Sequence, residues 1–459
     1  MPDNAVSRPS LRSSVRSRGR KTAVVAPALV AVCAAVAAGC GTSTSPSAPQ
    51  GDPNAPLEVW TRSQDSAAKV YTRIFEEFTK KTGQKVEYKA VFNDFDKQIQ
   101  QRAANKDLPD LVITDTGSLG VFTQQGLVGE VDRASLAGAA DVSERAWGNA
   151  RTSDGKFHAV PWSTQATVTL IRKDWREKLG KPVPATHEQL LDLAKAFTSQ
   201  DPDGNGQADT YGILAPATTD RGYTLWWASN FLWQGGGDVL KDSGNGKFQV
   251  AIDSPESQRS VEWIRGLFCD SKVMNPNALT LTTNDAHPLF ETGKVGIYTT
   301  GPYMFSRFDK NLGKDKYEVI PAPRGPGGDT VLGEGEDMYI MAGSPNPAGQ
   351  KKLVEFMLTP EVQQMGMKVQ AGETPVVRLP VNKNVDVKTV LNDPRWDTTK
   401  QVYESAGRPF PAVPNFQPFR QKTSESLNKI FTCTTDTRAE LGKLAGELTK
   451  ELSTQGIKQ

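Results

Sequence analysis

Strand-like and helix-like patterns of apolar residues alternate along the chain from residue 57 onward. LEVWTR (57–62) alternates apolar and polar residues and then becomes polar, which predicts a first strand. From Asp65 to Lys80 apolar residues recur every three or four positions, which predicts an amphipathic helix that ends near Gly83. The apolar positions that define this helix are Val70, Ile74, Phe75 and Phe78.

The alternation of strand and helix continues downstream. KVEYKAV (85–91) predicts a second strand, Asp94 to Asn105 a second helix, and PDLVIT (109–114) a buried third strand. This order predicts an α/β fold with a doubly wound sheet. Ligands of such sheets bind outside the carboxyl ends of the strands, which here lie near 62–65 and 115–118.

The stretch 155–175 predicts a passage between two globular lobes. Its apolar run is interrupted by Pro161 and resumes as a strand that ends near Trp175. Because proline has no N–H for the sheet, we expect the strand to split at Pro161. Such a crossing would place Trp162 and Gln165 at the rim of a cleft between the lobes. The alternative is an ordinary strand with a buried tryptophan.

The N-terminal residues predict an extracellular location. Residues 1–21 are basic and residues 22–39 carry no charge, which predicts a signal peptide over 1–39, with a membrane-spanning anchor as the alternative. AAGC at the end of this segment resembles a bacterial lipobox, in which the chain is cut before a lipidated cysteine, here Cys40. Ala37 stands where that motif usually has Leu.

The segment 40–55 is rich in Gly, Ser, Thr and Pro, which predicts a flexible tether. We therefore expect a domain attached to the extracellular face of the cell membrane by acyl chains such as palmitate.

Removal of the leader changes the size and charge to be explained. The 420 residues of 40–459 exceed what one hydrophobic core usually serves, so two domains are expected. They carry 48 Lys and Arg against 51 Asp and Glu, without a dense basic block, which argues against a nucleic-acid partner. Cys269 and Cys433 remain after Cys33 and Cys40 are accounted for. An even pair outside the cell predicts a long-range disulfide, with two buried free thiols as the alternative.

Five segments, taken in their order and spacing, carry a family resemblance. Over about 57–455 the chain resembles the extracellular solute-binding proteins of the maltose type, the substrate-capturing components of ATP-binding-cassette (ABC) sugar importers. The segments are PDLVITDTGSLGVFTQQGLVGEVD (109–132), GKFHAVPWSTQATVTLIRKDW (155–175), DPDGNGQADTYG (201–212), LFETGKVGIYTTGPY (289–303) and LVEFMLTPEVQQMG (353–366).

The resemblance implies a two-lobe fold of the type II periplasmic-binding-protein kind, with doubly wound sheets and a three-crossover hinge. The first lobe would contain 56–163 and 334–380, and the second lobe 164–333 and 381–459.

The three crossings implied by the resemblance would lie near Pro161, near 333–336 and near 377–380. GEGED (333–337) suits a hinge, and a plain loop explains it about as well.

Aromatic rings stack on the apolar faces of sugars, while amides, carboxylates and arginines bind the hydroxyl groups. By the resemblance, the preferred wall residues are Trp162, Gln165, Trp226 and Tyr303. The adjacent Trp227 would point about 100° away from Trp226 on a helix, so that one of the two packs inward. Each single tryptophan is also explained as a core residue.

Other candidate ligand-binding residues come from both predicted lobes. Glu336 and Asp337 stand where relatives often carry a Trp, which indicates a more polar or cationic ligand, such as an amino sugar or another polyol. The remaining candidates are Arg62, Gln64, Asp65, Asp115 and Thr116 at the strand ends, and Phe419 and Arg420 in the late helical segment.

The loop 201–212 has the spacing of an EF-hand-like calcium loop. Its ligands would be Asp201, Asp203, Asn205, the carbonyl of Gln207, and Asp209. Gly212 stands where the bidentate Glu is expected, so another carboxylate would have to complete the shell. A turn without metal is the alternative. Any calcium would be structural, because all its ligands lie in one loop and no position needs to stay open for chemistry. No cofactor is expected to be required.

Enzymatic motifs are weak in this sequence. Residues 66–69 fit S-x-x-K and residues 81–83 fit K-T-G, but they lie on one helix and turn, so we treat both as chance. A glycosidase needs only two carboxylates, which sequence does not exclude, so a secreted carbohydrate-active enzyme stays an alternative. Another is a ligand-binding protein that reports to a signalling receptor.

The resemblance therefore implies a lipid-anchored, monomeric, non-catalytic binding protein. It would capture a saccharide between two lobes by hinge closure and deliver it to the permease subunits of an ABC transporter.

Overall fold

The computed structural model describes residues 55–152, 154–244 and 246–459. The predicted signal peptide, Cys40 and the tether apart from Ala55 lie outside the described residues. Within the described ranges, no helix is both long enough and apolar enough to cross a membrane.

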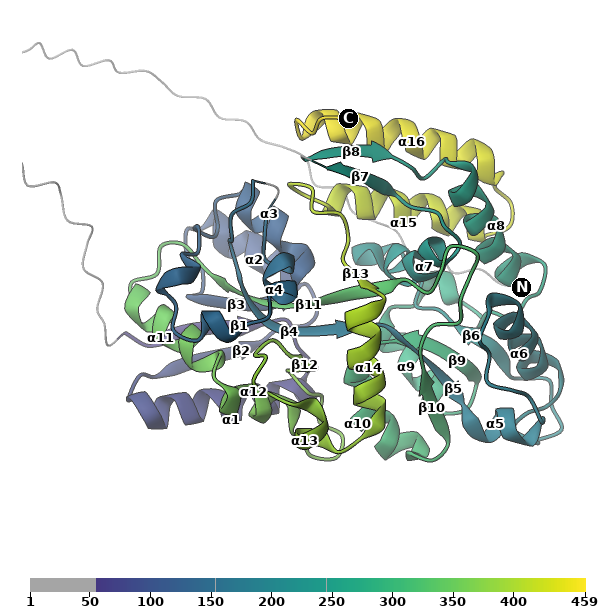
Figure 1. Ribbon diagram of the computed structural model, residues 1–459, viewed down its shortest axis with the longest axis horizontal. Coiled ribbons are helices and arrows are strands. Elements are labelled where there is room, and N and C mark those ends of the chain that lie inside the picture. The colour runs from purple at the N-terminus through teal and green to yellow at the C-terminus, as the bar shows by residue number, and fades with distance from the viewer. Residues whose placement is uncertain (1–54, 153, 245) are drawn as a thin grey trace, which may run out of the picture. The chain divides into compact units, whose positions relative to one another are not determined.

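Strands of the described residues form three sheets (Figure 1). The strands are β1 (Leu57–Thr61), β2 (Val86–Ala90), β3 (Leu111–Asp115), β4 (Val160–Ala166), β5 (Val168–Arg172), β6 (Tyr211–Leu214), β7 (Leu240–Gly244), β8 (Lys247–Val250), β9 (Val295–Thr300), β10 (Tyr317–Ile320), β11 (Val331–Ile340), β12 (Leu379–Pro380) and β13 (Gly407–Arg408). The first sheet has the order β12-β4-β11-β3-β1-β2, with β13 beside β11. The second has the order β10-β5-β9-β6, and the third pairs β7 with β8.

Helices cover these sheets. They are α1 (Asp65–Thr82), α2 (Phe95–Ala104), α3 (Leu119–Gln124), α4 (Glu144–Asn149), α5 (Lys173–Lys178), α6 (His187–Ser199), α7 (Tyr223–Gln234), α8 (Pro255–Cys269), α9 (Thr283–Glu291), α10 (Phe305–Phe308), α11 (Pro347–Met357), α12 (Pro360–Met367), α13 (Val387–Leu391), α14 (Pro394–Ser405), α15 (Gln417–Phe431) and α16 (Thr437–Thr454). Two short 3₁₀ turns, η1 (Thr116–Ser118) and η4 (Asp220–Gly222), precede α3 and α7.

The first five predicted elements are confirmed. Strands β1, β2 and β3 are parallel, and Val59 of β1 pairs with Tyr88 on one side and Leu111 on the other. Figure 1 shows α1 on one side of these strands and α2 on the other, as in a doubly wound sheet. The carboxyl ends of β1 and β3 therefore lie side by side, and the N–H of Arg62 donates to the carbonyl of Ile113 at 2.9 Å.

The predicted split at Pro161 is wrong, because Pro161 lies within β4. The pairing of β4 with β11 shifts its register here, so that Pro161 lies opposite Asp337 and Ser163 lies opposite Glu336. This bulge, which leaves Trp162 without a counterpart, is a site where a sheet tolerates proline. The strand ends instead at Ala166, and the chain passes at Thr167 from the first sheet to β5 of the second.

The GEGED segment is neither a loop nor a turn, because all five residues lie in β11. Its glycines allow a close approach of neighbouring backbone. A Cβ atom on Gly335 would lie 2.2 Å from the carbonyl oxygen of Ser163, and one on Gly333 would lie 2.8 Å from the Cα of Gly407. The role of this segment as a hinge stays a prediction.

The chain just after the predicted third crossing contacts the predicted first lobe. The N–H of Ser143 donates to Val381 at 2.9 Å, and the N–H of Lys383 donates to Asp141 at the same distance. Helix α14 and strand β13 follow this contact along the chain. The exact lobe boundaries stay a prediction.

A disulfide joins Cys269, the last residue of α8, to Cys433, which follows α15. It links positions 164 residues apart in the sequence. The neighbouring rings of Phe268 and Phe431 stack at a centroid distance of 5.0 Å, so α8 and α15 are joined by both a covalent bond and an aromatic contact.

Candidate functional site

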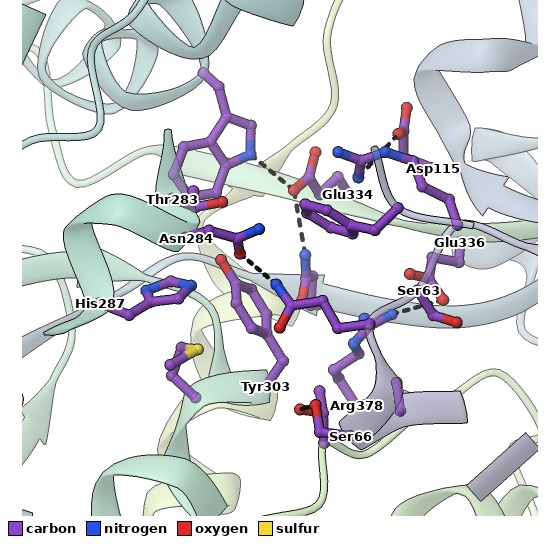
Figure 2. A pocket seen from close by; sticks show the side chains of 18 of the residues that line it. Ser63, Ser66, Asp115, Thr283, Asn284, His287, Tyr303, Glu334, Glu336 and Arg378 are labelled. Atoms are coloured by element: carbon purple, nitrogen blue, oxygen red, sulfur yellow. Dashed lines mark hydrogen bonds and ion pairs between the residues drawn. The ribbon is translucent and has the colours of Figure 1, made fainter. Parts of the chain in front are cut away.

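A cavity of about 160 Å³ opens beyond the carboxyl ends of β1 and β3. Figure 2 shows Asn284 and His287 on one side of it and Asp115 and Glu336 on the other, with Tyr303 between them. Of the predicted ligand-binding residues, those that line this cavity are Arg62, Gln64, Asp115, Gln165, Trp226, Tyr303, Glu336 and Arg420.

The two adjacent tryptophans point in different directions, as expected for neighbours on a helix. Trp226 of α7 lines the cavity, and its Nε1–H donates to Glu334 at 2.9 Å. Trp227 is fully buried and packs on Phe231 and Phe268. The placement of Trp227 in the binding site is therefore wrong, because its ring belongs to the hydrophobic core.

The placement of Trp162 at the cavity wall is also wrong. Its side chain is fully buried, and its Nε1–H donates to the hydroxyl of Tyr71 at 3.0 Å. The structure instead agrees with the alternative interpretation, an ordinary strand with a buried tryptophan. Tyr71 donates in turn to Glu336 at 3.3 Å, so Trp162 supports a cavity residue from behind.

Three further candidates lie near the cavity without lining it. Asp65 begins α1 and borders a separate cavity with Lys310. Thr116 borders a second cavity of about 90 Å³, which shares Glu334 and Arg420 with the first. Phe419 is fully buried against Phe416, because consecutive residues of α15 point to different faces of the helix.

Asp337 is turned away from the cavity. Consecutive residues of a strand point to opposite faces, so Glu336 reaches the cavity and Asp337 enters the interior. The Asp337 side chain is only 1% exposed, and its Oδ2 has no hydrogen-bond partner among the described residues. Burial, followed by the charges of Asp115 and Glu336, raises the pKa of Asp337 well above its ordinary value.

Sequence reasoning missed several residues of the cavity wall. Glu334 lies two residues before Glu336 on β11, so strand alternation would have placed both on one face. Others lie on α7, α9 and α10 or, in the case of Arg221 and Arg378, outside the α-helices and strands. They include Arg221, Tyr223, Asn284, His287, Arg307 and Arg378.

Each carboxylate of the cavity has its own set of partners. Asp115 pairs with Arg221 at 3.0 Å, and Glu336 pairs with Arg378 at 2.8 Å. Burial raises the pKa of Asp115, but Arg221 and neighbouring arginines outweigh burial, and the pKa lies below its ordinary value. The arginines therefore favour the ionised form of Asp115.

Glu334 has neutral partners instead. One of its oxygens accepts from the Trp226 indole at 2.9 Å and from the Gln165 amide at 3.2 Å (Figure 2). Burial raises the pKa of Glu334. The Oε1 of Gln165 has no hydrogen-bond partner within the described part of the chain, so it is an acceptor available to a ligand hydroxyl.

The titratable rings of the cavity are neutral at ordinary pH. Burial, followed by the charge of Arg307, lowers the pKa of His287 to about 3. Burial raises the pKa of Tyr303 to about 12, and its hydroxyl shares a hydrogen bond of 3.0 Å with Thr300. The cavity thus combines aromatic rings with many fixed donors and acceptors, an arrangement suited to binding a polar ligand.

The loop predicted to bind calcium is satisfied by contacts of its own. The carboxylate of Asp201 accepts from the N–H groups of Gly204, Asn205 and Gly206 at 3.0 to 3.1 Å. Asp209 pairs with Lys294 at 2.5 Å. In the part of the chain that the structure describes, no three His, Cys, Asp or Glu side chains converge as metal ligands. The residues as they stand do not form a complete cation site.

The fold matches solved structures over most of the chain. A solute-binding protein of an ABC transporter from Thermotoga lettingae, solved with α-D-tagatose bound, has a TM-score of 0.75 and 21% sequence identity. The match covers 86% of this chain and 99% of that one. The predicted two-lobe α/β fold of the type II periplasmic-binding-protein class is therefore confirmed.

The family is established by the sequence match. Residues 63–364 match the model of the bacterial extracellular solute-binding proteins, which is more than half of the chain. The protein belongs to this family.

The chain is similar in sequence to two curated proteins, and the match covers a different share of each. The polygalacturonan/rhamnogalacturonan-binding protein YtcQ of Bacillus subtilis is 31% identical over 39% of this chain, and the match spans only 35% of YtcQ. A probable ABC transporter-binding protein of Deinococcus radiodurans is 27% identical over 65% of this chain and 71% of its own length.

The buried Asp337 generates a pH-dependent prediction. A folded-state pKa above the unfolded value means that the folded protein keeps a proton that the unfolded chain releases. The resulting stability is fully present below the unfolded pKa and is lost as the pH rises toward the folded pKa. We expect Asp337→Asn, which cannot lose a proton, to be more stable relative to wild type at pH 8 than at pH 5.

Urea unfolding at both pH values measures this difference. The control is Asp253→Asn at an exposed position, where the free energy of unfolding should change by no more than about 0.5 kcal/mol. An equal loss of stability for Asp337→Asn at both pH values would contradict the prediction.

Proposed function

We propose that this protein captures a saccharide between its two predicted lobes by hinge closure and delivers it to the permease of an ABC transporter. The observation that carries the proposal is the cavity itself, where rings, amides, carboxylates and arginines from distant parts of the chain converge. Membership of the solute-binding family supports capture over catalysis. The names of relatives, which include an ABC transporter-binding protein and a polygalacturonan-binding protein, support a saccharide ligand and an importer.

The carboxylates of the cavity also favour binding over hydrolysis. Asp115 and Glu336 are paired with arginines, and Glu334 accepts two hydrogen bonds from neutral donors. All three groups are therefore fixed as acceptors, which suits recognition of hydroxyl groups.

Contacts across the cavity support hinge closure. The amide of Gln64, at the start of α1, donates to Asn284 of α9 in a short hydrogen bond (Figure 2). Arg62, just beyond β1, donates to the hydroxyl of Tyr223 of α7 at 3.4 Å. A ligand that bridges the same two sides would favour the closed form by its higher affinity for that form.

Saccharide binding is tested by a thermal-shift screen of the mature protein against mono- and oligosaccharides, including oligomers of galacturonic acid. A ligand at a hundred times its dissociation constant should add about 2.7 kcal/mol of stability. We expect Gln165→Ala to lower the affinity for the best ligand by about tenfold, because the substitution removes one buried hydrogen-bonding side chain. Isothermal titration gives both affinities.

The matched control is Gln421→Ala, a partly exposed residue of α15 outside the cavity, which should leave the affinity unchanged. Mass spectrometry of the bound sugar separates capture from catalysis, since a cleaved product would indicate a carbohydrate-active enzyme. No thermal shift with any sugar would contradict the proposed function.

Lipid anchoring and delivery rest on the sequence motif at Cys40 and on the family. We expect Cys40→Ala to move the protein from the membrane fraction into the medium, because the acyl attachment is lost. Uptake of the ligand by cells should fall, while the purified variant should bind it unchanged. Retention of Cys40→Ala in the membrane fraction would contradict the lipid anchor, and unchanged uptake would contradict delivery from the anchored form.

Calcium binding by the loop 201–212 stays a prediction that rests on the spacing of its acidic and amide residues. If calcium binds, the melting temperature should rise in calcium relative to a chelator, and Asp201→Asn should abolish the rise. Equal melting temperatures in calcium and in chelator would show that the loop is a turn without metal, stabilised by Lys294 and its own hydrogen bonds.

A further inference from the structure

Three arginines surround one carboxylate at the end of β3. Asp115 lies 3.0 Å from Arg221 and 4.0 Å from Arg62. Arg420 of α15 also borders the cavity beside Asp115 and contributes to the lowering of the Asp115 pKa. Arg221 has a second, outer partner in Asp96, so its charge is compensated. The positive charges of Arg62 and Arg420 are not compensated in this way.

Arg420 forms no ion pair with any described carboxylate. Its one side-chain hydrogen bond runs from Nε to the carbonyl oxygen of Gly222 at the long distance of 3.4 Å. Gly222 has a φ of +70°, and a Cβ atom there would lie 2.5 Å from the Arg420 stem. The glycine therefore leaves room for the arginine to reach the cavity, where burial lowers its pKa.

Arg62 is also incompletely paired. Its side chain is only 16% exposed, and its Nε has no hydrogen-bond acceptor among the described residues. Its contacts to Asp115 at 4.0 Å and to the Tyr223 hydroxyl at 3.4 Å are both at the long limit of such interactions. Burial lowers the pKa of Arg62, but the charges of Tyr223 and Asp115 outweigh burial and the pKa is raised. The guanidinium is therefore charged, and its Nε–H is available to an acidic group of a ligand.

The remaining charges of the cavity do not cancel these two arginines. Arg378 is paired with Glu336, and Arg307 is paired with Glu291. Glu334 is the carboxylate of the cavity that has neutral partners instead of an arginine. Arg420 therefore interacts with Asp115 and Glu334 through their charges and without a described ion pair, and Arg62 has Asp115 at 4.0 Å as its ion-pair partner. Both guanidinium groups keep N–H donors for an acidic group of a ligand.

Resting on the proposed function, we infer that the ligand is an anionic saccharide whose acidic group binds between Arg62 and Arg420. Guanidinium groups match carboxylate and phosphate oxygens in geometry and in charge, so a uronic acid or a sugar phosphate supplies the required chemistry. This inference reverses the cationic ligand expected from Glu336 and Asp337. Glu336 is neutralised by Arg378, and Asp337 lies outside the cavity.

The test compares saccharides that differ only in charge. The probes are glucuronic and galacturonic acid as monomers and dimers, each beside its uncharged methyl ester, together with glucose and galactose phosphates. Isothermal titration with the mature protein should show at least about tenfold tighter binding of an acid than of its ester, and this preference should shrink as salt is raised. The uronate and phosphate series identify which acidic group fits.

Two variants of opposite effect place the acidic group. Arg420→Gln should reduce the acid-to-ester preference to within about twofold, because a guanidinium that can bind a carboxylate through two N–H groups is lost. Arg62→Gln is a second variant that tests the same part of the cavity. Glu334→Gln should increase the preference, because a repelling carboxylate is removed. Arg324→Gln, at an exposed position away from the cavity, is the matched control and should leave the preference unchanged.

The outcomes separate this inference from the proposed function. Equal binding of an acid and its ester, or binding of neutral sugars alone, would overturn the anionic ligand while leaving saccharide capture intact. An acid-to-ester preference that survives both Arg420→Gln and Arg62→Gln would also overturn it. The absence of binding to every sugar, charged or neutral, would instead overturn the proposed function.

Discussion

The close pairing of β4 with β11 is the constraint on which the binding cavity depends. A Cβ atom on Gly335 would lie 2.2 Å from the Ser163 carbonyl oxygen, so any larger residue at 335 would separate the two strands. These strands carry Gln165, Glu334 and Glu336 into the cavity. Gln165 lies opposite Glu334 in the regular part of the pairing, and the bulge follows Glu336. The close backbone contact at Gly335 therefore positions these polar side chains, in addition to the hydrogen bonds that they form with one another.

The carboxylates of the cavity differ in the side chains that they contact. Buried carboxylates are stable in this setting only with strong partners, and the cavity uses two solutions. Asp115 and Glu336 pair with arginines, whereas Glu334 accepts hydrogen bonds from an indole and an amide. The rings of His287 and Tyr303 remain neutral because burial moves their pKa values away from neutrality. These side chains give the cavity wall fixed hydrogen-bond donors and acceptors.

The sequence from residue 57 to residue 115 predicted β1, β2 and β3 correctly. The spacing of apolar residues within each short segment is enough to distinguish a strand from a helix there. The position of Pro161 within a strand is not predictable from its local sequence, because the sheet tolerates this proline only at a bulge formed with β11, more than 170 residues later. Asp337 was misplaced because a short Gly-rich segment was interpreted without strand alternation, which would also have indicated Glu334. Arg221 and Asn284 could not be predicted, because η4 and the start of α9 meet the ends of β1 and β3 only in the folded chain.

The disulfide has a consequence for when the cavity becomes complete. Helix α15 begins near Arg420 at the cavity and ends just before Cys433, so the bond to Cys269 fixes the far end of the helix that carries this arginine. Disulfides persist in oxidising compartments and are rare in the cytosol. A chain with both thiols reduced would position Arg420 by packing alone. The position of Arg420 in the cavity therefore depends in part on oxidation of the two cysteines. An oxidising compartment would give a more firmly positioned Arg420 than a reducing one.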